Sequence, residues 1–347
     1  MTKFFTPRFA KSFFIFSLAF IFLTAGQETL NASPKRKIII DSDTGADDAS
    51  AIILAAKNQE IEILGVTVLA GNVDLKQSAK NALAALEIAG SNAPVYKGSA
   101  EKLSGEHINV FSVFGKDGMG DADLIHPKIL PEDKDAIEFI LETVNKYPGE
   151  VEIVALGPVT NIAKAIKKDP DTMKKVKKIW SMGSTGLGAG NASPVAEFNV
   201  YGDPAAYKIM LDSGINITVV GLDMCGGKAQ WTNDQFEKLE KINEAGKFVA
   251  ASFGKIRKFY ASNGSADSVM NCDSLAMMCV LHPDFVKKII LSHGSCITER
   301  GETYAQVIFY QKGFTYDIVS NDYDYNVALV AEVEKEKYFD MFLSAIQ

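Results

Sequence analysis

The chain has 347 residues, of which 47% are hydrophobic, and its formal net charge at pH 7 is −7. The acidic excess argues against a nucleic acid partner, because a phosphate backbone is bound by basic surfaces. The densest group of lysines, within residues 174–178, is interpreted as a helix end on a solvated face. The chain has four cysteines, Cys225, Cys272, Cys279 and Cys296. Their spacing matches no zinc-binding motif and indicates no disulfide framework, although a single disulfide between two of them is left open.

The N-terminus has the features of a secretory signal peptide. Three basic residues precede an apolar run over residues 13–25, which is shorter than the ~20 residues that a membrane-spanning helix needs. We expect residues 1–26 to be removed by cleavage near Gln27, which would take away three cations and no acid and change the net charge from −7 to −10. The mature protein would then be periplasmic or secreted, without a stable membrane anchor. An uncleaved anchor is the alternative interpretation.

Apolar runs rich in β-branched residues predict strands that alternate with helices along the chain. The predicted strands are 38–40, 61–69, 151–156, 176–182 and 215–221. The predicted helices are 49–57, 77–89, 133–146, 161–168, 204–213 and 236–262. Such alternation is typical of a parallel sheet with helices on both faces. We therefore predict a single Rossmann-like α/β domain over residues 35–347, with a mostly parallel central sheet flanked by helices and with its functional loops at one edge.

Four aspartates follow the first predicted strand within eight residues: Asp41, Asp43, Asp47 and Asp48. They lie on a strand-to-helix loop, at the carboxyl end of a strand, where open α/β sheets usually bind ligands. Carboxylates this close to one another repel unless they are protonated or bound to a metal. The cluster therefore predicts a hard divalent cation held by oxygen ligands.

Simpler interpretations explain only part of this cluster. Asp47 and Asp48 alone would be typical of the capped first turn of a helix, but capping does not explain Asp41 and Asp43. The Asp-x-Asp-x-Thr/Val loop of haloacid-dehalogenase-like phosphatases does not match, because the fifth residue of this motif is Gly45. The EF-hand pattern, with its glycine and its final glutamate, does not match either.

Later predicted strands also end in polar or glycine-rich sequence. Asn72 follows the second strand, residues 157–161 follow the third and residues 183–191 follow the fourth. The glycine series in 183–191 lacks both the Walker lysine and the spacing of a dinucleotide-binding loop, so a nucleotide-phosphate loop is not favoured. Glu197 and Asn199 then stand two residues apart, ahead of a predicted helix.

Taken together, these loops make the chain resemble the nucleoside hydrolases, calcium-dependent N-ribohydrolases often called inosine-uridine-preferring, over nearly all of residues 35–347. The family motif Asp-x-Asp-x-Gly-x-Asp-Asp stands at residues 41–48, after the first strand. Further matches stand at residues 71–72, 157–163, 182–183, 190–199 and 220–223. The resemblance implies hydrolysis of the N-glycosidic bond of ribonucleosides, with purine nucleosides favoured, for nucleoside salvage. It also implies a homodimer or homotetramer.

The resemblance implies that Ca²⁺ is held by the carboxylates of Asp43, Asp48 and Asp273 and by the main-chain carbonyl of Leu156. These ligands leave positions for a water and the ribose diol, which suits an ion with six to eight oxygen ligands. Without the resemblance, Asp273 would be interpreted as the N-cap of the helix that follows it.

The resemblance also implies a mechanism. Departure of the base leaves oxocarbenium-like charge on the sugar, and water attacks from the opposite face, as in an inverting glycosidase. Asp43 is expected to be the general base. The implied ribose contacts are Asp47, Asn72 and Asn199 at the ring hydroxyls, Asn191 and Glu197 at the 5′-hydroxyl, and Met182 against the sugar face.

The chain departs from the family pattern at two positions. Many members have a histidine as leaving-group acid where this chain has Cys272, which places it in the subgroup with cysteine there; a proton-donating thiol and an inert, packed one are both open. Phe114 stands where a loop histidine often lies, so Phe114, Trp231 and Tyr260 are candidate base-stacking residues. The missing histidine leaves open a non-catalytic exported protein that binds nucleosides or ribose, which turnover would exclude.

Overall fold

The computed structural model describes residues 34–105, 108, 110–264, 267–311 and 324–347. The predicted signal peptide, residues 1–26, lies outside the described residues. Residues 35–347 form one compact unit. Among the described residues, every helix is too short or too polar to cross a membrane.

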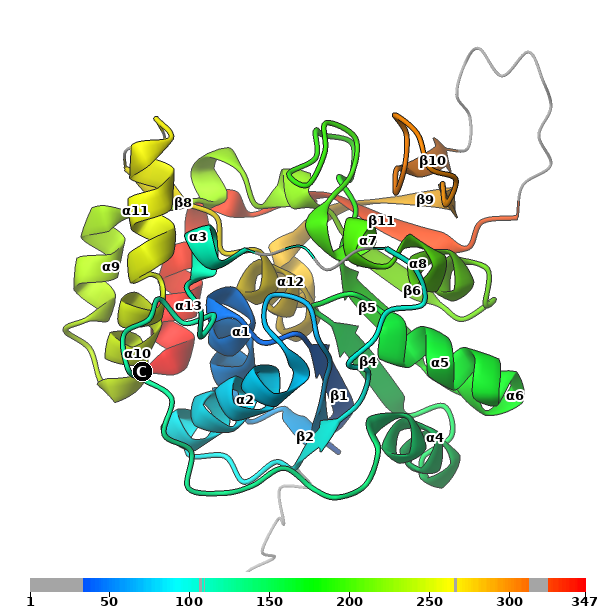
Figure 1. The fold of residues 1–347 in the computed structure, drawn as a ribbon, viewed down its shortest axis with the longest axis horizontal. Coiled ribbons are helices and arrows are strands. Elements are labelled where there is room, and N and C mark those ends of the chain that lie inside the picture. The colour runs from blue at the N-terminus through cyan, green and yellow to red at the C-terminus, as the bar shows by residue number, and fades with distance from the viewer. Residues whose placement is uncertain (1–33, 106–107, 109, 265–266, 312–323) are drawn as a thin grey trace, which may run out of the picture. The chain divides into compact units, whose positions relative to one another are not determined.

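A nine-stranded sheet runs through this unit in the order β10-β9-β11-β6-β5-β4-β1-β2-β3 (Figure 1). Its strands are β1 (Arg36–Ser42), β2 (Ile61–Val68), β3 (Val95–Lys97), β4 (Val151–Ala155), β5 (Lys178–Met182), β6 (Ile217–Val220), β9 (Val286–Cys296), β10 (Val307–Gln311) and β11 (Val327–Val333). All neighbouring strands pair in parallel except β9, which is antiparallel to both β10 and β11. The predicted α/β class with a mostly parallel central sheet is confirmed.

Helices cover both faces of the sheet, because the central strands are apolar on both sides. Ile38 and Ile40 of β1 belong to one buried cluster, whereas Ile39 between them belongs to the other. The first cluster packs under α1 (Ala46–Lys57), α2 (Leu75–Ala89), α10 (Glu244–Ser252), α12 (Cys272–Leu281) and α13 (Tyr338–Ile346). The second packs under α4 (Ala136–Lys146), α5 (Thr160–Lys168) and α8 (Pro204–Leu211).

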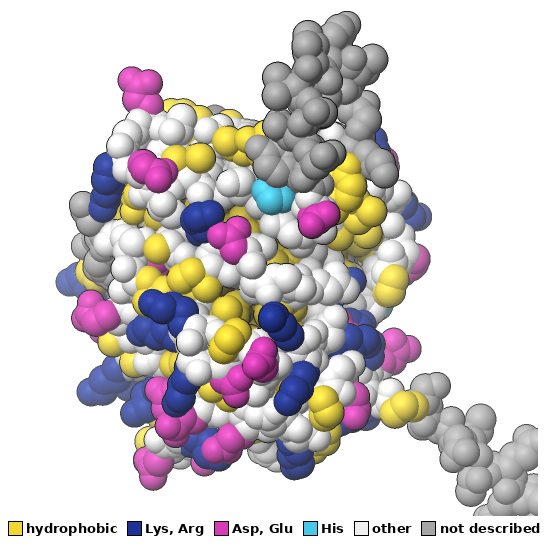
Figure 2. All heavy atoms as spheres, turned by 90° about the vertical axis from the view of Figure 1, so that its right-hand side faces the viewer, with side chains coloured by type: hydrophobic (Ala, Val, Ile, Leu, Met, Phe, Trp, Pro, Cys, Tyr) yellow, Lys and Arg dark blue, Asp and Glu magenta, His cyan; other side chains and the backbone are white. Residues whose placement is uncertain are grey.

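Further elements complete the described chain. They are α3 (Phe111–Phe114), α6 (Pro170–Met173), α7 (Phe198–Gly202), α9 (Asn233–Leu239), α11 (Gly254–Ser262), four 3₁₀ turns (Leu222–Met224, Gly227–Ala229, Pro283–Phe285 and Lys335–Lys337) and a small antiparallel pair of β7 (Trp231–Thr232) with β8 (Ser268–Val269). Lys174 and Lys175 follow α6 and are exposed, as the interpretation of a helix end on a solvated face requires, whereas Lys178 of the same group begins β5 and is half-buried. On the face shown in Figure 2, basic and acidic side chains are interspersed.

One sequence-based expectation about the elements needs correction, and several elements were not expected. The single helix predicted over 236–262 is three helices, α9, α10 and α11. The chain breaks before α10 because the Asn243 side chain accepts a hydrogen bond from Gly246 N at 2.8 Å and so starts a new helix. The strands β3, β9, β10 and β11 and the C-terminal helix α13 were not predicted.

The position of β1 in the sheet determines where a ligand can bind. The order from β3 to β6 is 3-2-1-4-5-6, so the chain reverses its direction of travel across the sheet between β1 and β4. Loops that leave the carboxyl ends of these two strands diverge to opposite faces, and open α/β sheets bind their ligands in the crevice between them. The aspartate cluster follows β1, and Leu156 follows β4.

Candidate active site

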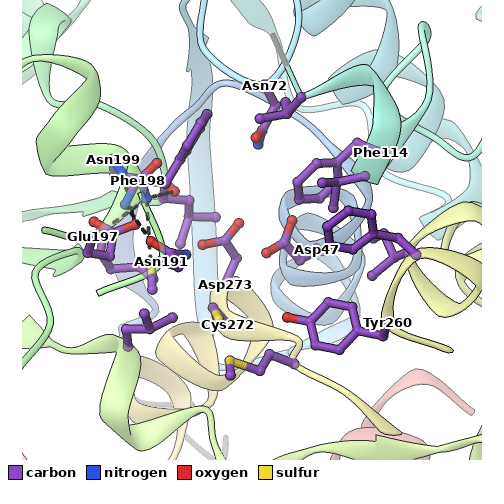
Figure 3. Close-up of a pocket in the computed structure, with 18 residues that line it drawn as sticks. Asp47, Asn72, Phe114, Asn191, Glu197, Phe198, Asn199, Tyr260, Cys272 and Asp273 are labelled. Carbon is purple, nitrogen blue, oxygen red and sulfur yellow. Dashed lines mark hydrogen bonds between the residues drawn. The ribbon is translucent and has the colours of Figure 1, made fainter. Parts of the chain in front are cut away.

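A cavity of about 260 Å³ lies at the carboxyl edge of the sheet (Figure 3). Its walls come from the end of β5, from the segments that follow β2, β4, β5, β6 and β8, and from helices α1, α3, α7, α11 and α12. The lining residues are Asp47, Asn72, Val110, Val113, Phe114, Leu156, Met182, Asn191, Glu197, Phe198, Asn199, Leu222, Ile256, Phe259, Tyr260, Met270, Cys272 and Asp273. One end of the cavity is polar and the other is apolar and aromatic, so the cavity suits a ligand with the same division.

Asp43 is fully buried beside this cavity rather than in its wall. Its Oδ2 accepts a hydrogen bond from Asn72 N at 2.6 Å, whereas its Oδ1 has no hydrogen-bond partner. Burial, together with the nearby charge of Asp47, raises the pKa of this carboxyl to about 7. A buried carboxylate oxygen without a partner is costly, and a bound cation or water would satisfy it.

Asp48 is also fully buried, and its two oxygens contact the end of β1, the connection that follows β1 and the loop after β2. Oδ1 accepts from Ser42 Oγ at 2.7 Å, and Oδ2 accepts from Gly45 N at 2.9 Å and from the Asn72 side-chain amide at 3.1 Å. The bond from Gly45 N is the capping contact expected for the third residue of a helix. Capping therefore accounts for one contact of Asp48, but not for the acidic group that surrounds it.

The carboxylates of Asp47, Asp48 and Asp273 converge from two helices. One oxygen of each lies within 4.8 Å of the others, and Figure 3 shows Asp47 and Asp273 side by side at the middle of the cavity. Asp47 Oδ1 is buried without a hydrogen-bond partner. Asp273 is the second residue of α12, whose N-cap is Asn271, so the alternative in which Asp273 caps this helix does not hold.

Burial raises the pKa of each carboxyl in this group, and the negative neighbours raise it further. Such a group is stable near neutral pH only if it keeps protons or takes up positive charge. A cation is the simpler solution, because oxygens of Asp43 and Asp47 lack protein partners and all donors are oxygens. The residues therefore fit a hard divalent cation.

A second polar group lies across the cavity, at the start of α7. Glu197 is the N-cap of this helix: its carboxylate accepts hydrogen bonds from Asn199 N at 2.8 Å and from Val200 N and Ser184 N at 3.2 Å each. Asn191 accepts from Phe198 N at 2.9 Å and lies beside Glu197 in Figure 3. Glu197 is thus a buried side chain rather than a surface charge.

The Asn199 side chain joins the ends of β4 and β5. Its amide nitrogen donates to the Leu156 carbonyl at 2.9 Å and contacts the Met182 carbonyl at 3.3 Å and the Met182 sulfur at 3.4 Å. The Leu156 carbonyl keeps a second lone pair for another partner. All three residues line the cavity, although β4 and β5 lie far from α7 in the sequence.

The opposite end of the cavity is aromatic. Phe114, Phe259 and Tyr260 line it together with Ile256 and Met270. The hydroxyl of Tyr260 points into the cavity (Figure 3), and burial raises its pKa. Flat aromatic and aliphatic walls of this kind fit a planar heterocycle.

The Cys272 thiol also faces this end of the cavity. It is 9% exposed, and a hydrogen bond with the Cys225 thiol together with burial raises its pKa well above the ordinary value. The thiol therefore keeps its proton at neutral pH. The cysteines of the described chain are all buried and free, and no disulfide joins them.

Trp231 does not reach the cavity, which removes it from the candidate base-stacking residues. Its side chain is fully buried, and its ring packs against an aromatic cluster with centroid separations from 4.6 to 6.1 Å: Phe236, Phe253, Tyr338, Phe339 and Phe342. This position, close to helix α13, belongs to the core between helices rather than to a site.

Several lining residues were not predicted from the sequence. Apolar members such as Leu222, Ile256, Phe259 and Met270 carry no chemistry that separates them from core residues. Phe198 stands between Glu197 and Asn199, so proximity to these two residues is the only sequence signal that points to it.

Comparisons with known proteins agree with this geometry. The family model described as inosine-uridine preferring nucleoside hydrolase matches residues 38–340. Uridine nucleosidase 1 of Arabidopsis thaliana is 40% identical over 250 residues, which cover 72% of this chain and 74% of the relative. The pyrimidine-specific ribonucleoside hydrolase RihB of Escherichia coli (strain SE11) is 32% identical over 259 residues, which cover 73% of this chain and 80% of the relative.

Solved structures extend the similarity to the whole fold. The plant nucleoside hydrolase PpNRh1 superposes with a TM-score of 0.84 at 30% identity, covering 90% of this chain and 99% of its own. A purine-preferring ribonucleoside hydrolase from Gardnerella vaginalis superposes with a TM-score of 0.78 at 29% identity, and the match covers 90% of this chain and 98% of that enzyme. The chain therefore belongs to the inosine-uridine preferring nucleoside hydrolase family and is a ribonucleoside hydrolase, an N-glycosyl hydrolase.

Proposed function

We propose that this ribonucleoside hydrolase works with Ca²⁺, held by the carboxylates of Asp43, Asp48 and Asp273 and by the Leu156 carbonyl. Members of the family are metal-dependent, and the acidic cluster stands where a metal is needed. The observation that carries the proposal is the buried Asp43 oxygen without a partner beside three converging carboxylates. A site made only of oxygens, several of them carboxylate oxygens, favours calcium over softer metals.

Asp43 is proposed as the general base. Bound calcium would supply positive charge that makes a nearby water easier to deprotonate. The partner-free Oδ1 of Asp43 is available to accept that proton, while the bond from Asn72 N holds the other oxygen in place. The base is thus fixed in orientation before the substrate arrives, which lowers the cost of reaching the reactive geometry.

The polar half of the cavity is proposed to bind the ribose. Asp47, Asn72 and Asn199 would contact the ring hydroxyls, and Met182 would lie against the sugar. Glu197 and Asn191, on the α7 side, would hold the 5′-hydroxyl. The side chains of Asn191, Glu197 and Asn199 are each oriented by a hydrogen bond to the main chain, so the ribose would meet fixed partners.

The aromatic half is proposed to bind the base and help it leave. Phe114 and Tyr260 would contact the ring of the nucleobase face to face or edge to face. Cys272 would donate a proton or a hydrogen bond to a nitrogen of the departing base. The raised pKa of the thiol keeps that proton on sulfur at neutral pH but also makes it a weak acid. We therefore expect substrates with good leaving groups to be cleaved fastest.

Base preference is the part of the proposal with two candidates. The sequence favoured purine nucleosides, and the matched structure from Gardnerella vaginalis is purine-preferring. The relatives from Arabidopsis thaliana and Escherichia coli are described as a uridine nucleosidase and a pyrimidine-specific hydrolase, and both are more similar in sequence to this chain than the Gardnerella vaginalis enzyme is. We therefore place uridine beside inosine at the head of the substrate panel.

The biological setting is proposed from the sequence. The leader over residues 1–26 supports export to the periplasm or beyond, where the enzyme would release bases from nucleosides for salvage. We also propose a homodimer or homotetramer, and no nucleic acid partner. Mass spectrometry of the exported protein and light scattering would test the cleavage near Gln27 and the oligomeric state.

The deciding experiment measures ribose release from uridine, cytidine, inosine, adenosine and guanosine, with Ca²⁺ present or removed by a chelator. We expect release that stops on chelation and returns with added Ca²⁺. Release that is unchanged after full removal of metal would contradict the calcium assignment. Saturable nucleoside binding without any ribose release would instead support the non-catalytic alternative.

A further inference from the structure

Two motif residues that the proposed chemistry does not use, Asp41 and Asn161, form a buried hydrogen-bonded pair. Asn161 Nδ2 donates to Asp41 Oδ1 at 2.8 Å, and Thr67 Oγ1 donates to the same oxygen at 2.6 Å. Asp41 is 1% exposed and Asn161 is 0% exposed. The pair links the end of β1 to the first turn of α5, across 120 positions of sequence.

The Asn161 side chain also holds two further strand ends. Its Oδ1 accepts from Ser99 N at 2.8 Å, after β3, and its Nδ2 also contacts the Val68 carbonyl at 3.3 Å, at the end of β2. A Cβ at Gly98 would lie 2.3 Å from Asn161 Oδ1, so the backbone after β3 packs directly against this amide. One side chain therefore ties β1, β2 and β3 to α5.

Three of the segments that Asn161 contacts, those at β1, β2 and α5, lead directly to groups of the carboxylate site. Asp43 comes two residues after Asp41, and Asn72, whose N–H orients Asp43, comes four residues after Val68. Leu156 donates its N–H to the Asp41 carbonyl at 2.8 Å and lies just ahead of α5. The next residue along, Gly157, packs so closely that a Cβ there would lie 2.5 Å from Asp43 Oδ1.

We propose that Asn161 is a positioning residue that, through Asp41, sets the affinity of the carboxylate site for its divalent cation. This inference rests on the cation assignment made in the proposed function. Without the Asn161 bonds, the loops after β1, β2 and β4 lose their common anchor, and cation binding must then order them. Removing the outer partners of metal ligands typically costs 10–100-fold in affinity, and we expect an effect in this range for Asn161, which reaches the ligands through Asp41.

The test compares Asn161→Ala with the parent protein, each freed of metal and titrated with Ca²⁺ in a calorimeter. The expected result is a dissociation constant raised about 10–100-fold, with a far-UV circular dichroism spectrum like that of the parent. The calorimetric readout is independent of turnover. A loss of activity alone would not separate positioning from damage to the fold.

Asn326→Ala is the matched control. Asn326 is another structural amide: its nitrogen donates to the Leu211 and Gly294 carbonyls at 2.9 and 3.1 Å, and its oxygen accepts from Gly294 N at 2.7 Å. It stands just before β11, which runs parallel to β6, so it lies at the edge of the sheet opposite the cavity. We expect its Ca²⁺ dissociation constant to stay within about twofold of the parent value, since its bonds reach none of the segments that carry the proposed ligands.

The outcomes separate the two proposals. Parent protein that binds no Ca²⁺ would overturn the calcium assignment and this inference with it. Parent protein that binds Ca²⁺ while Asn161→Ala binds it equally well, or is weakened no more than Asn326→Ala, would overturn the role of Asn161 alone. If Asn161→Ala does not fold, Thr67→Val replaces it in the test, because this change removes the other hydrogen bond to Asp41 Oδ1. A Ca²⁺ dissociation constant raised about threefold or more in Thr67→Val supports the inference. An unchanged dissociation constant overturns it.

Discussion

Asp43 occupies a space that two glycines leave open. A Cβ at Gly71 would lie 1.9 Å from Asp43 Oδ2, and one at Gly157 would lie 2.5 Å from Oδ1. The backbone of both loops therefore contacts the carboxylate directly, and any larger residue would displace it. This arrangement explains, at the level of single residues, why glycines follow β2 and β4 in the sequence.

Replacing Asp43 with asparagine tests its role as general base. We expect Asp43→Asn to lower kcat by about 10²–10⁴-fold, because the neutral amide cannot accept a proton from water. Ribose release under saturating nucleoside gives kcat, and circular dichroism checks the fold. Asp171→Asn, on the exposed first turn of α6, is the control and should leave kcat unchanged. Equal turnover of Asp43→Asn and the parent would disprove the assignment.

Cys272 can be tested through the leaving group. We expect Cys272→Ala to slow the cleavage of uridine and inosine about tenfold or more, within the range of general acid catalysis, and to slow a nitrophenyl riboside little, because nitrophenolate departs without a proton. Measuring kcat/KM for both kinds of substrate gives the ratio. Cys279→Ala removes another buried thiol of α12 and should leave the ratio as in the parent. A uniform loss on both substrates would show that the Cys272 thiol only packs.

The sequence revealed those site residues whose chemistry is unusual for their position. Asp43, Asp47 and Asp48 stand within six residues, on the loop after β1 and in the first turn of α1, so their placement needed no tertiary information. Trp231 was misplaced because an aromatic side chain gives no sign of whether it faces a cavity or a core. Phe259 and Met270 were missed for the same reason, and the link between Asp41 and Asn161 depends on strand pairing that the sequence does not state.

At the scale of secondary structure, the N-cap of α7 joins folding to substrate binding. Glu197 caps the helix through Asn199 N and Val200 N, and it is also the proposed partner of the 5′-hydroxyl. We expect Glu197→Ala to cost about 0.5–2 kcal/mol of stability, as loss of a cap does. We also expect it to reduce the preference for uridine over 5′-deoxyuridine about tenfold or more, because a hydrogen bond to a charged group is lost.

Thermal unfolding and kcat/KM for both substrates measure the two effects of this change. Asp135→Ala removes the cap of α4, where Asp135 accepts from Ile137 N at 2.9 Å and Glu138 N at 3.3 Å, far from the cavity lining. This control should lose similar stability and keep the full preference for the 5′-hydroxyl. A Glu197→Ala variant that keeps the preference would assign that carboxylate to capping alone.

The predictability of the elements follows their burial. Strands β1, β2, β4, β5 and β6 were predicted because a strand buried on both faces is a continuous apolar run. β9 was missed because much of its first half is exposed and carries lysines, and because an antiparallel strand near the sheet edge lacks that continuous signal. The helix predicted over 236–262 was wrong since periodicity alone does not show a cap such as Asn243.

At the scale of the whole molecule, the topology determines which groups meet. The reversal of strand order between β1 and β4 brings the aspartate cluster and Leu156 to one crevice. Helices α11 and α12, which come later in the chain, bring Tyr260, Cys272 and Asp273 to the same cavity. The polar groups come from loops after strands and from the first turns of α1, α7 and α12, whereas the aromatic groups come mainly from α3 and α11. A nucleoside, with its polar sugar and flat base, matches that division.

The same concentration of acid at one edge makes the stability of the metal-free protein depend on pH. Burial raises the pKa values of the Asp43 and Glu197 carboxyls to about 7 and that of the Asp41 carboxyl to about 6, above the ordinary range near 4. Between about pH 4 and pH 7, the folded chain therefore binds more protons than the unfolded chain. Its free energy of unfolding therefore falls as the pH rises from about 4 to 7, by up to about 1.4 kcal/mol per carboxyl and pH unit.

Calcium should reverse that trend, because a bound cation replaces the protons as the source of positive charge. We expect the Tm of the chelated protein to fall as the pH rises from 5 to 8. At pH 8, the Tm with saturating Ca²⁺ should exceed that of the chelated protein by several degrees. This gap in Tm should narrow towards pH 5, because protons then compete with Ca²⁺ for the carboxylates. Thermal scans across this range, with magnesium as the comparison ion, measure the gap. A gap of equal size at every pH would mean that the ion binds elsewhere than at the buried carboxylates, since only their titration couples calcium binding to pH in this range.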